Sequence, residues 1–478
     1  MNRKRTHRIS GIRGKKFLLV GLGILGGGES IARFLKQHGA QLTITDLKNR
    51  GALTPVLKRL GTKGISLTLG RHVESDFKKN DTVVYNPSVS IESSWVKLAQ
   101  RNKKHIENDL SLFLALMKDH KDFEYVAVTG TRGKTTTTGW IAHFLRGSVV
   151  GGNMPSRGLF NLIDKKGRPF ILELSSFQLE FMRKGLPAPR VAVITRMFVD
   201  HLNRHGTFKR YIDVKARIFM NQTHADDIVL SADDPHTRDF LRHKQHGRVY
   251  FTSLTKLPKA KNGLFLFRKH IYFQKHGRTT KVFLTPDFPE HQLSNLLSAL
   301  LAAYLYTKSW NGFKERIQTL PMPIFRQQAV YVSKKLTIIN DSAGTSPDAT
   351  VAALKHFSKK QKRNRPLVLI AGGTDKMLEF SDLAKTIVSL VKQKHLYLLE
   401  GSATDKLIVC LQTKRYFKKT KPRTFESLDA LCNTLFSGKK PRGYVLFSPA
   451  SASFEKFKNE FDRGHTFNRL VKKYLWKE

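Results

Sequence analysis

Residues 124–145 read EYVAVTGTRGKTTTTGWIAHFL, and this stretch decides the fold. The apolar run at 125–128 predicts a buried strand, and the residues after the glycine-containing loop predict a helix. Glycines let backbone N–H groups close around phosphates, and the N-terminus of the following helix adds the positive end of a dipole. Lys134 can then reach the β- and γ-phosphates of a nucleotide, while the Thr135 hydroxyl can ligate Mg²⁺. The stretch therefore predicts a nucleotide-binding α/β domain.

The loop departs in one respect from the strict phosphate-loop pattern GxxxxGK[ST]. Val128 stands where that pattern has its first glycine, so the loop is a GxxGKT variant. A glycine turn with an exposed lysine is the alternative interpretation, but the strand before the loop and the helix after it favour a phosphate loop. The residues predicted to contact ATP from this loop are Gly130, Thr131, Arg132, Gly133, Lys134, Thr135 and Thr136.

Strand and helix patterns alternate along the whole chain, which is typical of α/β domains with largely parallel sheets. A basic stretch between residues 231 and 292 lacks this pattern, and we expect it to be irregular. A polar stretch at 118–124 and a proline-containing stretch at 319–324 mark the predicted domain boundaries. We expect domains at residues 1–118, 119–322 and 323–478.

The chain has 478 residues, with 84 Lys and Arg against 37 Asp and Glu, which gives a formal net charge of +47. A charge this large first suggests nucleic acid or an anionic membrane as a partner. Apolar residues make up 40% of the chain, which excludes a disordered or collagen-like protein. Its two cysteines, Cys410 and Cys432, cannot form a disulfide framework, and this favours a reducing cytoplasm.

The N-terminus imitates a secretion signal. Seven Lys or Arg residues among the first sixteen precede an apolar run at 17–28. Glycines and Glu29 end that run without a clear small-residue cleavage site, so we expect no secretion. No apolar run reaches the roughly 18 residues that a membrane-spanning helix needs. We therefore expect a cytoplasmic protein without a transmembrane segment.

A second glycine pattern, Gly21-x-Gly23-x-x-Gly26, follows the apolar run at 17–20. Asp46 ends the next predicted strand, 20 residues after Gly26. Taken alone, the strand, the glycines and the acid are the fingerprint of a dinucleotide-binding domain. An NAD-linked dehydrogenase is therefore one hypothesis, which the phosphate loop opposes.

Five motifs together resemble the Mur ligase family, and the resemblance covers essentially the whole chain. They are the loop with its run of four threonines, GGN at 151–153, LELSSFQLE at 172–180, GGTDK at 372–376 and SPASASFEKFKNEFDRG at 448–464. LELSSFQLE and the last motif are most similar to the family member that adds D-glutamate. The related folylpolyglutamate synthases share the loop, so the loop alone does not choose the substrate.

The resemblance implies an α/β fold with a Rossmann-like N-terminal UDP-binding domain, a central P-loop ATPase-type domain and a Rossmann-like C-terminal domain. It implies that ATP drives the addition of D-glutamate to UDP-N-acetylmuramoyl-L-alanine through an acyl phosphate, in peptidoglycan precursor synthesis. It also implies two Mg²⁺ sites, the second through a carbamylated Lys215. Because a carbamate forms from a neutral amine and CO₂, Lys215 should lie where its charged form is disfavoured.

The same resemblance assigns site residues position by position. The catalytic residues are Lys134, Glu173, His201 and Lys215, and the Mg²⁺ ligands are Thr135, Glu173, His201 and Lys215. Further ATP contacts are Asn295, Arg326 and Asp341. The UDP precursor contacts are Gly23, Leu25, Gly26, Asp46, Asn86, Asn153 and Ser175. The glutamate contacts are Thr345, Lys376, Ser453 and Phe461, although Thr345 and Ser453 are also suited to cap helices.

The chain departs from the family pattern beside several of these residues. The departures are Ser88 for a glycine, Gln292 for an asparagine, Phe325 and Gln328 beside Arg326, Ala343 for a lysine, and Glu460 at an aromatic position.

Two other classes of protein stay open at this point. A related ligase that uses another amino acid or acceptor, such as L-glutamate or a folate tail, would share the loop. A basic P-loop ATPase that binds nucleic acid would account for the charge, but the basic residues are spread along the chain and no known nucleic-acid module is evident. We expect a monomer without a specific nucleic-acid partner.

Overall fold

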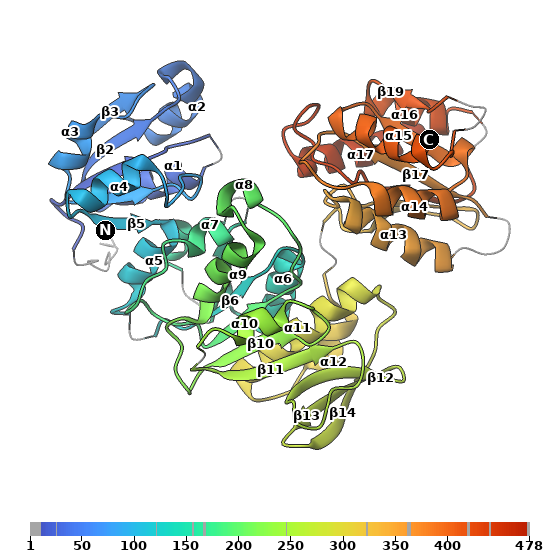
Figure 1. The fold of residues 1–478 in the computed structure, drawn as a ribbon, viewed down its shortest axis with the longest axis horizontal. Helices are drawn as coiled ribbons and strands as arrows, with labels where there is room; N and C mark the ends of the chain where they lie inside the picture. Colours follow the sequence, from blue (N-terminus) through green and yellow to red (C-terminus); the bar gives the residue numbers. More distant parts are fainter. Residues whose placement is uncertain are drawn as a thin grey trace, which may run out of the picture. The chain divides into compact units, whose positions relative to one another are not determined.

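The computed structural model describes residues 11–475 except for 25, 121, 155–156, 166–168, 245, 322–323, 361–364, 418–420 and 439–440. These described residues form an α/β fold with three sheets (Figure 1), which confirms the class expected from the alternating patterns. The chain divides into two compact units, Met1–Pro321 with two sheets and Met322–Glu478 with the third. The stretch at 319–324 lies partly outside the described residues, and the three predicted domain ranges stay predictions.

The first sheet is buried on both faces. Its elements are β1 (Lys16–Val20), α1 (Gly27–Gln37), β2 (Gln41–Asp46), α2 (Arg50–Leu60), β3 (Ile65–Leu69), α3 (Glu74–Lys79), β4 (Thr82–Tyr85), α4 (Ser94–Arg101), β5 (His105–Asn108) and α5 (Asp109–Met117). The parallel strands lie in the order β3-β2-β1-β4-β5. Leu18 and Val20 pack with α3 and α4, whereas Phe17 and Leu19 pack with α1, α2 and α5. Burial on both faces explains why this strand reads as a continuous apolar run.

The order of this sheet reverses between β1 and β4, so the helices that follow these two strands, α1 and α4, pack on opposite faces. Open α/β sheets bind ligands at such a switch point. The loop after β1 carries the glycines from Gly21 to Gly26, and the loop after β4 begins with Asn86. A Cβ atom at Gly28 would lie 2.3 Å from the Leu22 carbonyl oxygen, so α1 approaches the loop more closely than any other residue would allow.

The second sheet carries the phosphate loop on a central strand. Its elements are β6 (Tyr125–Thr129), α6 (Lys134–Phe144), β7 (Val149–Gly152), η1 (Leu159–Leu162), β8 (Phe170–Glu173), α7 (Ser176–Leu179), β9 (Val191–Ile194), α8 (Leu202–His205), α9 (Phe208–Ala216), η2 (Arg217–Phe219), β10 (Asp227–Ser231), α10 (Thr237–Leu241), β11 (Arg248–Ser253), β12 (Gly263–Phe267), β13 (His270–Lys275), β14 (Arg278–Leu284), α11 (Glu290–Thr307) and α12 (Phe313–Gln318). The strand order is β14-β13-β12-β11-β10-β9-β6-β8-β7, with β6 parallel to β8 and β9. Val126 and Val128 pack with α6 and α11, and Tyr125 and Ala127 pack in the core that holds α9. The predicted strand, loop and helix are confirmed.

The expectation of an irregular stretch between residues 231 and 292 is wrong. Strands β11 to β14 occupy much of it, and β13 pairs antiparallel with both β12 and β14. Ile271 and Phe273 of β13 are buried, while His270 and Tyr272 between them are half-buried. This two-residue period is the mark of a strand with one packed face, and the many basic residues around it hid the pattern.

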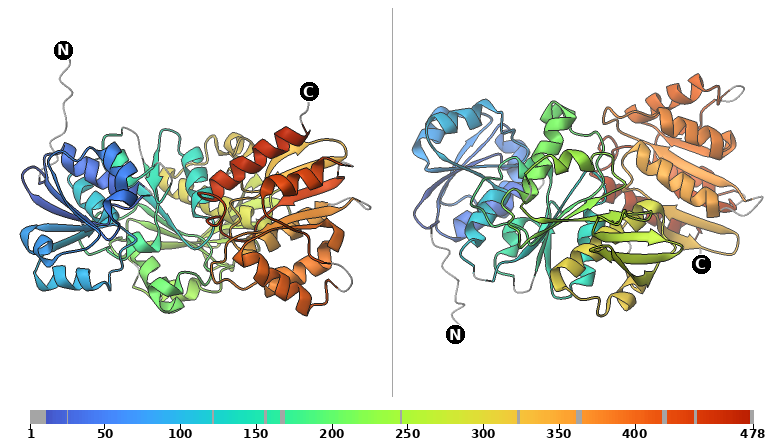
Figure 2. Two further views of the ribbon diagram at one scale, coloured as in Figure 1. Left: turned by 90° about the horizontal axis from the view of Figure 1, so that it is seen from above. Right: turned by 60° about the horizontal axis from the view of Figure 1, so that its bottom comes forward.

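The third sheet forms the C-terminal unit. Its elements are β15 (Gln328–Val332), β16 (Leu336–Asn340), α13 (Pro347–Lys360), β17 (Leu367–Gly372), α14 (Ser381–Leu390), η3 (Gln393–His395), β18 (Leu396–Leu399), α15 (Ser402–Thr413), β19 (Thr424–Phe425), α16 (Leu428–Phe436), β20 (Gly443–Phe447) and α17 (Glu460–Leu475). The strand order is β15-β16-β20-β17-β18-β19, and β15 alone among these described strands pairs antiparallel. Helices α13 to α15 pack on one face and α16 and α17 on the other (Figure 2). The loops after β16, β17 and β20 therefore share one edge of the sheet.

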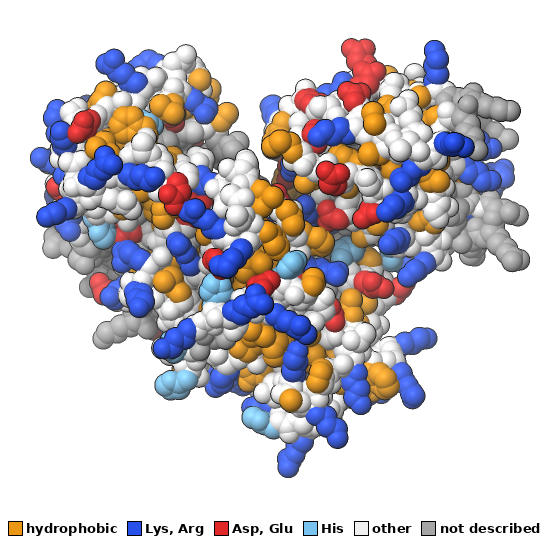
Figure 3. Space-filling view, viewed as in Figure 1, with side chains coloured by type: hydrophobic (Ala, Val, Ile, Leu, Met, Phe, Trp, Pro, Cys, Tyr) orange, Lys and Arg blue, Asp and Glu red, His pale blue; other side chains and the backbone are white. Residues whose placement is uncertain are grey.

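The surface view shows how the Lys and Arg side chains behind the net charge are distributed. Lys and Arg side chains are spread over the visible face instead of gathering in one patch (Figure 3). Within the described part of the chain, no helix combines the length and apolar character that crossing a membrane requires.

Candidate active site

The phosphate loop between β6 and α6 accepts only glycine at two positions. The φ angle is +144° at Gly130 and +88° at Gly133, backbone conformations that L side chains rarely adopt. A Cβ atom at Gly130 would lie 2.0 Å from Thr195 Oγ1, and one at Gly133 would lie 2.3 Å from Asn295 Oδ1. The loop is therefore packed against the end of β9 and against α11. Asn295, predicted for the ATP site, lies directly beside the loop.

Thr131 and Arg132 anchor the loop through their backbones. Their N–H groups both donate to the carbonyl oxygen of Arg196, at 3.0 and 3.2 Å. These two N–H groups are thus already engaged. The first turn of α6 begins directly after the loop, and the N-terminus of a helix is suited to meet a phosphate. Thr135 in that turn is exposed, whereas Thr136 is buried.

Two lysine side chains meet at one carbonyl group of the loop. The Gly130 oxygen lies 3.1 Å from Lys134 Nζ and 2.9 Å from Lys215 Nζ. Lys215, on α9, is 1% exposed and also lies 3.2 Å from Thr129 Oγ1. Burial lowers the pKa of Lys215 well below its ordinary value, and the charge of Lys134 lowers it further. The charged form of Lys215 is therefore disfavoured, as the resemblance to the Mur ligases implies.

Glu173 ends β8, the strand beside β6, and is 2% exposed. Its Oε1 accepts a hydrogen bond from Asn153 Nδ2 at 3.3 Å. Its Oε2 is buried and has no hydrogen-bond partner among the described residues. A buried carboxylate oxygen without a partner is costly unless a cation meets it. Mg²⁺ prefers oxygen ligands of this kind, so Glu173 fits the predicted metal-ligand role.

His201 and Asp200 close the segment that follows β9. The φ angle of His201 is +53°, and its Nδ1 lies 3.8 Å from Asp200 Oδ1, while Asp200 Oδ2 accepts from Arg132 Nη1 at 3.1 Å. Burial alone would raise the pKa of Asp200, but the charges of His201 and Arg132 outweigh it and the pKa is lowered. Among the described residues, no three His, Cys, Asp or Glu side chains are placed to hold a metal. Mg²⁺ is commonly held by one or two protein ligands together with substrate phosphates.

Residues predicted for the UDP precursor gather at the switch point of the first sheet. The Gly23 N–H group donates to Asp46 Oδ2 at 2.9 Å. Asn86 Nδ2 would lie 3.6 Å from a Cβ atom at Gly23, so the loops after β1 and β4 are in contact. Gly26 precedes α1 with a φ angle of +92°, and Leu25 lies outside the described residues.

The other two residues predicted for the precursor lie beside Glu173. The Asn153 N–H group donates to the Glu173 carbonyl oxygen at 2.8 Å. Ser175 precedes α7 and forms a capping box: its Oγ accepts from the Gln178 N–H at 3.2 Å, and Gln178 Oε1 accepts from the Ser175 N–H at 3.0 Å. The capping box fixes the start of α7 at the end of the strand that carries Glu173.

In the C-terminal unit, Asp341 follows β16 and is 3% exposed. Its Oδ2 accepts from the Ser448 hydroxyl at 2.8 Å and its Oδ1 from the Gln327 N–H at 3.1 Å. Burial raises the pKa of Asp341 to about 6, although the charge of Arg326 opposes the rise. Both oxygens already accept protein hydrogen bonds, so Asp341 holds the turn that carries Arg326.

The residues predicted for glutamate lie on the loops after β16, β17 and β20 and at the start of α17. Lys376 Nζ lies 3.5 Å from Thr345 Oγ1, which brings these two together. Ser453 Oγ is buried and has no hydrogen-bond partner among the described residues, so this hydroxyl does not cap a helix. The ring of Phe461 lies 6.3 Å from the ring of Phe325.

Comparison with known proteins shows which family the chain belongs to. The Mur ligase MurD-like N-terminal domain matches residues 15–107, and the Mur ligase middle domain matches residues 128–303. The UDP-N-acetylmuramoylalanine–D-glutamate ligases of Borreliella afzelii and Roseiflexus sp. are 36% and 34% identical to this chain, each over 97% of it and 99% of the relative. The chain belongs to the Mur ligase family.

Solved structures of Mur ligases share the fold at lower identity. UDP-N-acetylmuramate–alanine ligase of Thermotoga maritima matches with a TM-score of 0.58 and 20% identity, over 96% of this chain and 99% of that one. The MurF ligase of the same organism, solved in complex with ADP, matches with a TM-score of 0.58 and 17% identity, over 98% and 96%. These likenesses confirm the expected α/β architecture of a Mur ligase.

Arg463 of this Mur ligase was not singled out from the sequence. Its side chain is fully buried on α17. Nη1 donates to the Ala452 carbonyl at 2.9 Å, and Nη2 donates to the carbonyls of Ser342 and Ser451 at 2.9 and 3.0 Å. Burial lowers the pKa of Arg463 to about 10, with Glu460 opposing the shift. One guanidinium thus joins the loops after β16 and β20. Only its place in the motif at 448–464 could have indicated a role, because most arginines in a sequence lie at the surface.

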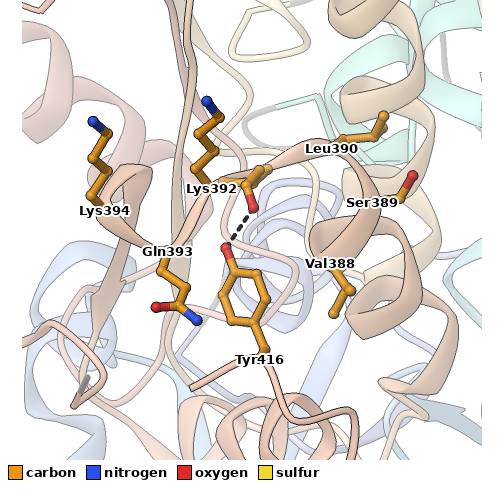
Figure 4. A pocket seen from close by; sticks show the side chains of 8 residues that line it. Val388, Ser389, Leu390, Lys392, Gln393, Lys394 and Tyr416 are labelled. Carbon is orange, nitrogen blue, oxygen red and sulfur yellow. Dashed lines mark hydrogen bonds between the residues drawn. The ribbon is translucent and has the colours of Figure 1, made fainter. Parts of the chain in front are cut away.

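A separate hollow lies on the C-terminal unit of this Mur ligase. It has a volume of about 550 Å³ and is bounded by the end of α14, residues 391–394 and Tyr416. Tyr416 and Val391 both line it, and the Tyr416 hydroxyl donates to the Val391 carbonyl at 2.6 Å (Figure 4). No predicted site residue lines this hollow.

Replacing Gly133 with alanine should weaken nucleotide binding, because the new Cβ atom would meet Asn295 and force a side chain into the left-handed region, at a cost of about 1–2 kcal/mol. We expect the affinity for Mg²⁺-ADP, measured by calorimetry, to fall about tenfold. Gly139→Ala in the same helix is the matched control, since no atom lies within 4 Å of its Cβ position. The control should keep its affinity, and equal losses in both variants would contradict the prediction.

Arg463→Lys keeps the charge but replaces a planar fork with a single nitrogen. We expect the thermal unfolding midpoint to fall by several degrees, because each buried carbonyl left without a donor costs about 1–3 kcal/mol. The matched control is Arg469→Lys on the same helix, where the exposed guanidinium donates to the Thr466 hydroxyl. A midpoint for Arg463→Lys equal to that of the control would argue against this account of Arg463.

Proposed function

We propose that the protein is an ATP-dependent ligase that joins D-glutamate to UDP-N-acetylmuramoyl-L-alanine, in the cytoplasmic synthesis of peptidoglycan precursors. The observation that carries the proposal is 34–36% identity, over 97% of the chain, to ligases named for this reaction. The phosphate loop, with the buried side chains of Glu173 and Lys215 around it, supports the ATP-dependent step.

The reaction has two steps that gather negative charge. The precursor carboxylate attacks the γ-phosphorus of ATP, which forms an acyl phosphate and releases ADP. The amine of D-glutamate then attacks the acyl carbon, and phosphate leaves. Cationic groups that are already in place stabilise such transition states. Lys134 supplies one charge, since its Nζ, now 3.1 and 3.2 Å from the carbonyl oxygens of Gly130 and Thr131, can donate to phosphate oxygens instead.

Mg²⁺, when bound, would neutralise phosphate charge and polarise the phosphoryl group. Thr135 and Glu173 would hold one ion, and His201 with a carbamylated Lys215 would hold the other. The lowered pKa of Lys215 supports the second assignment, because only a neutral amine reacts with CO₂. The negative charge of a carbamate on Lys215 would also attract the Lys134 ammonium group.

The substrate contacts are proposed from the resemblance and the loop positions. Gly23, Asp46 and Asn86, at the switch point of the first sheet, take the UDP end of the precursor. Asn153 and Ser175, beside Glu173, take the end that reacts. For D-glutamate we propose Thr345, Lys376, Ser453 and Phe461, and for ATP Arg326 and Asp341 in addition to the loop residues and Asn295.

A phosphate-release assay tests the function. We expect release only when ATP, UDP-N-acetylmuramoyl-L-alanine and D-glutamate are all present. Release with L-glutamate in place of D-glutamate would favour a related ligase. ATP hydrolysis that DNA stimulates without any precursor would favour a nucleic-acid-binding ATPase. The absence of product with every UDP-N-acetylmuramoyl acceptor would refute the proposal.

Removal of CO₂ should lower turnover, and bicarbonate should restore it, because the carbamate on Lys215 would be lost and reformed. Phosphate release in degassed buffer, with and without bicarbonate, measures this effect. Lys215→Arg should be inactive under both conditions, since a guanidinium forms no carbamate there. Lys209→Arg, an exposed lysine of the same helix, should behave as wild type. Wild-type turnover that bicarbonate leaves unchanged after degassing would count against the carbamate.

A further inference from the structure

Arg204, on α8, is a nearly buried guanidinium that binds two separate parts of the first unit. Its side chain is 10% exposed and that of its partner Glu180 is 4% exposed. Nε and Nη2 donate to the two carboxylate oxygens of Glu180 at 2.9 and 2.6 Å. Nη1 donates to the Ser88 carbonyl at 2.8 Å, and Nη2 lies 2.7 and 3.2 Å from the carbonyl oxygens of Val89 and Pro87. Three consecutive carbonyl groups therefore face one side chain.

The bonded segments belong to different sheets. Residues 87–89 follow β4 of the first sheet and directly follow Asn86, whose Cβ would lie 3.1 Å from a Cβ atom at Gly21. Arg204 lies on α8, between β9 and β10 of the second sheet, and stands three residues after His201. The side chain thus joins the loop proposed for the UDP end of the precursor to the segment that carries His201.

The ion pair of Arg204 and Glu180 has further contacts toward the first sheet and toward the second sheet. Glu180 Oε2 lies 3.4 Å from the Ile91 N–H nitrogen, on the side of the first sheet. On the side of the second sheet, Glu180 Oε1 lies 3.5 Å from His205 Nδ1. The ring of Phe177 lies 4.8 Å from the guanidinium carbon of Arg204 and 5.1 Å from the ring of His201. Arg204 is therefore coupled to His201 through a packed aromatic ring.

The chemistry of the substrate gives this connection its role. The precursor is long, with a diphosphate at one end and the reacting carboxylate at the other, and the two ends contact loops of different sheets. A misplacement of about 1 Å can slow a reaction about 100-fold. A guanidinium can fix a carboxylate and several carbonyls at once, because its donors form a rigid fork.

We propose that Arg204 is a positioning residue, which sets the distance between the UDP-binding loop at 86–89 and His201. The inference rests on the proposed function, because that function makes 86–89 part of a UDP site.

A second ion pair between the same sheets provides a control. Arg210 pairs with Glu92, but their side chains are 49% and 53% exposed. Exposed ion pairs contribute little to stability or geometry. Arg210→Lys should therefore leave both substrate affinities unchanged.

The test uses Arg204→Lys in the full chain, because lysine keeps the charge beside Glu180 but cannot reach three carbonyls together. We expect the KM for UDP-N-acetylmuramoyl-L-alanine to rise about tenfold while the KM for ATP stays within about twofold. We also expect faster hydrogen exchange at residues 86–91, measured by mass spectrometry without any substrate.

Each outcome decides the role of Arg204. A selective rise in the precursor KM with faster exchange at 86–91, both absent in Arg210→Lys, supports the proposal. Equal rises in both KM values, a lower unfolding midpoint with unchanged KM values, or unchanged exchange at 86–91 would overturn it. A wild-type protein that releases no phosphate with the precursor and D-glutamate would refute the proposed function instead, and is recognised before any variant is compared.

Discussion

The contact between Gly130 and Thr195 is the constraint on which the centre of this protein depends. With 2.0 Å between the Gly130 Cβ position and Thr195 Oγ1, a side chain at position 130 would separate the loop after β6 from the segment after β9. The contact brings Lys134 and Lys215, from different helices, to the same carbonyl oxygen. Burial lowers the pKa of Lys215 well below its ordinary value, and the charge of Lys134 lowers it further. The fold therefore prepares a neutral amine beside a phosphate loop.

Sequence patterns predict this centre well because its parts are local. A strand, a glycine loop and a helix are continuous in residues 124–145, and parallel strands bring their carboxyl ends to one edge of the sheet. For the same reason, Glu173 could be expected near the loop, since it ends a strand that pairs with β6. The glycine pattern at 21–26 likewise predicts a phosphate-binding turn, but the strand, glycines and acid do not distinguish UDP from NAD.

What the sequence could not predict depends on contacts between distant residues. The strands at 248–284 could not be predicted because basic residues, such as Lys261, Lys269 and Lys275, crowd their ends and the turns between them and mask the short apolar runs. The hydrogen bonds of Asp341 are another example. Its carboxylate accepts from the Ser448 hydroxyl and the Gln327 N–H group, which come from separate parts of the chain. The roles of Arg463 and Arg204 could not be predicted for a similar reason, since their carbonyl partners lie far away in the sequence and the chain has 84 Lys and Arg residues.

These two arginines show that a strongly basic chain can bury a few of its charged side chains and use them to hold loops together. Each gathers carbonyl groups from loops that follow parallel strands, where the backbone has left the sheet and needs new donors. They differ in their counter-charge. Arg204 pairs with the buried Glu180, so its loss would leave a buried carboxylate without its guanidinium, whereas the Arg463 guanidinium donates to carbonyl and hydroxyl oxygens. With a pKa of about 10, Arg463 keeps its charge at neutral pH even so. Lysine is therefore the informative replacement at both positions, because it preserves the charge and removes the fork that organises the loops.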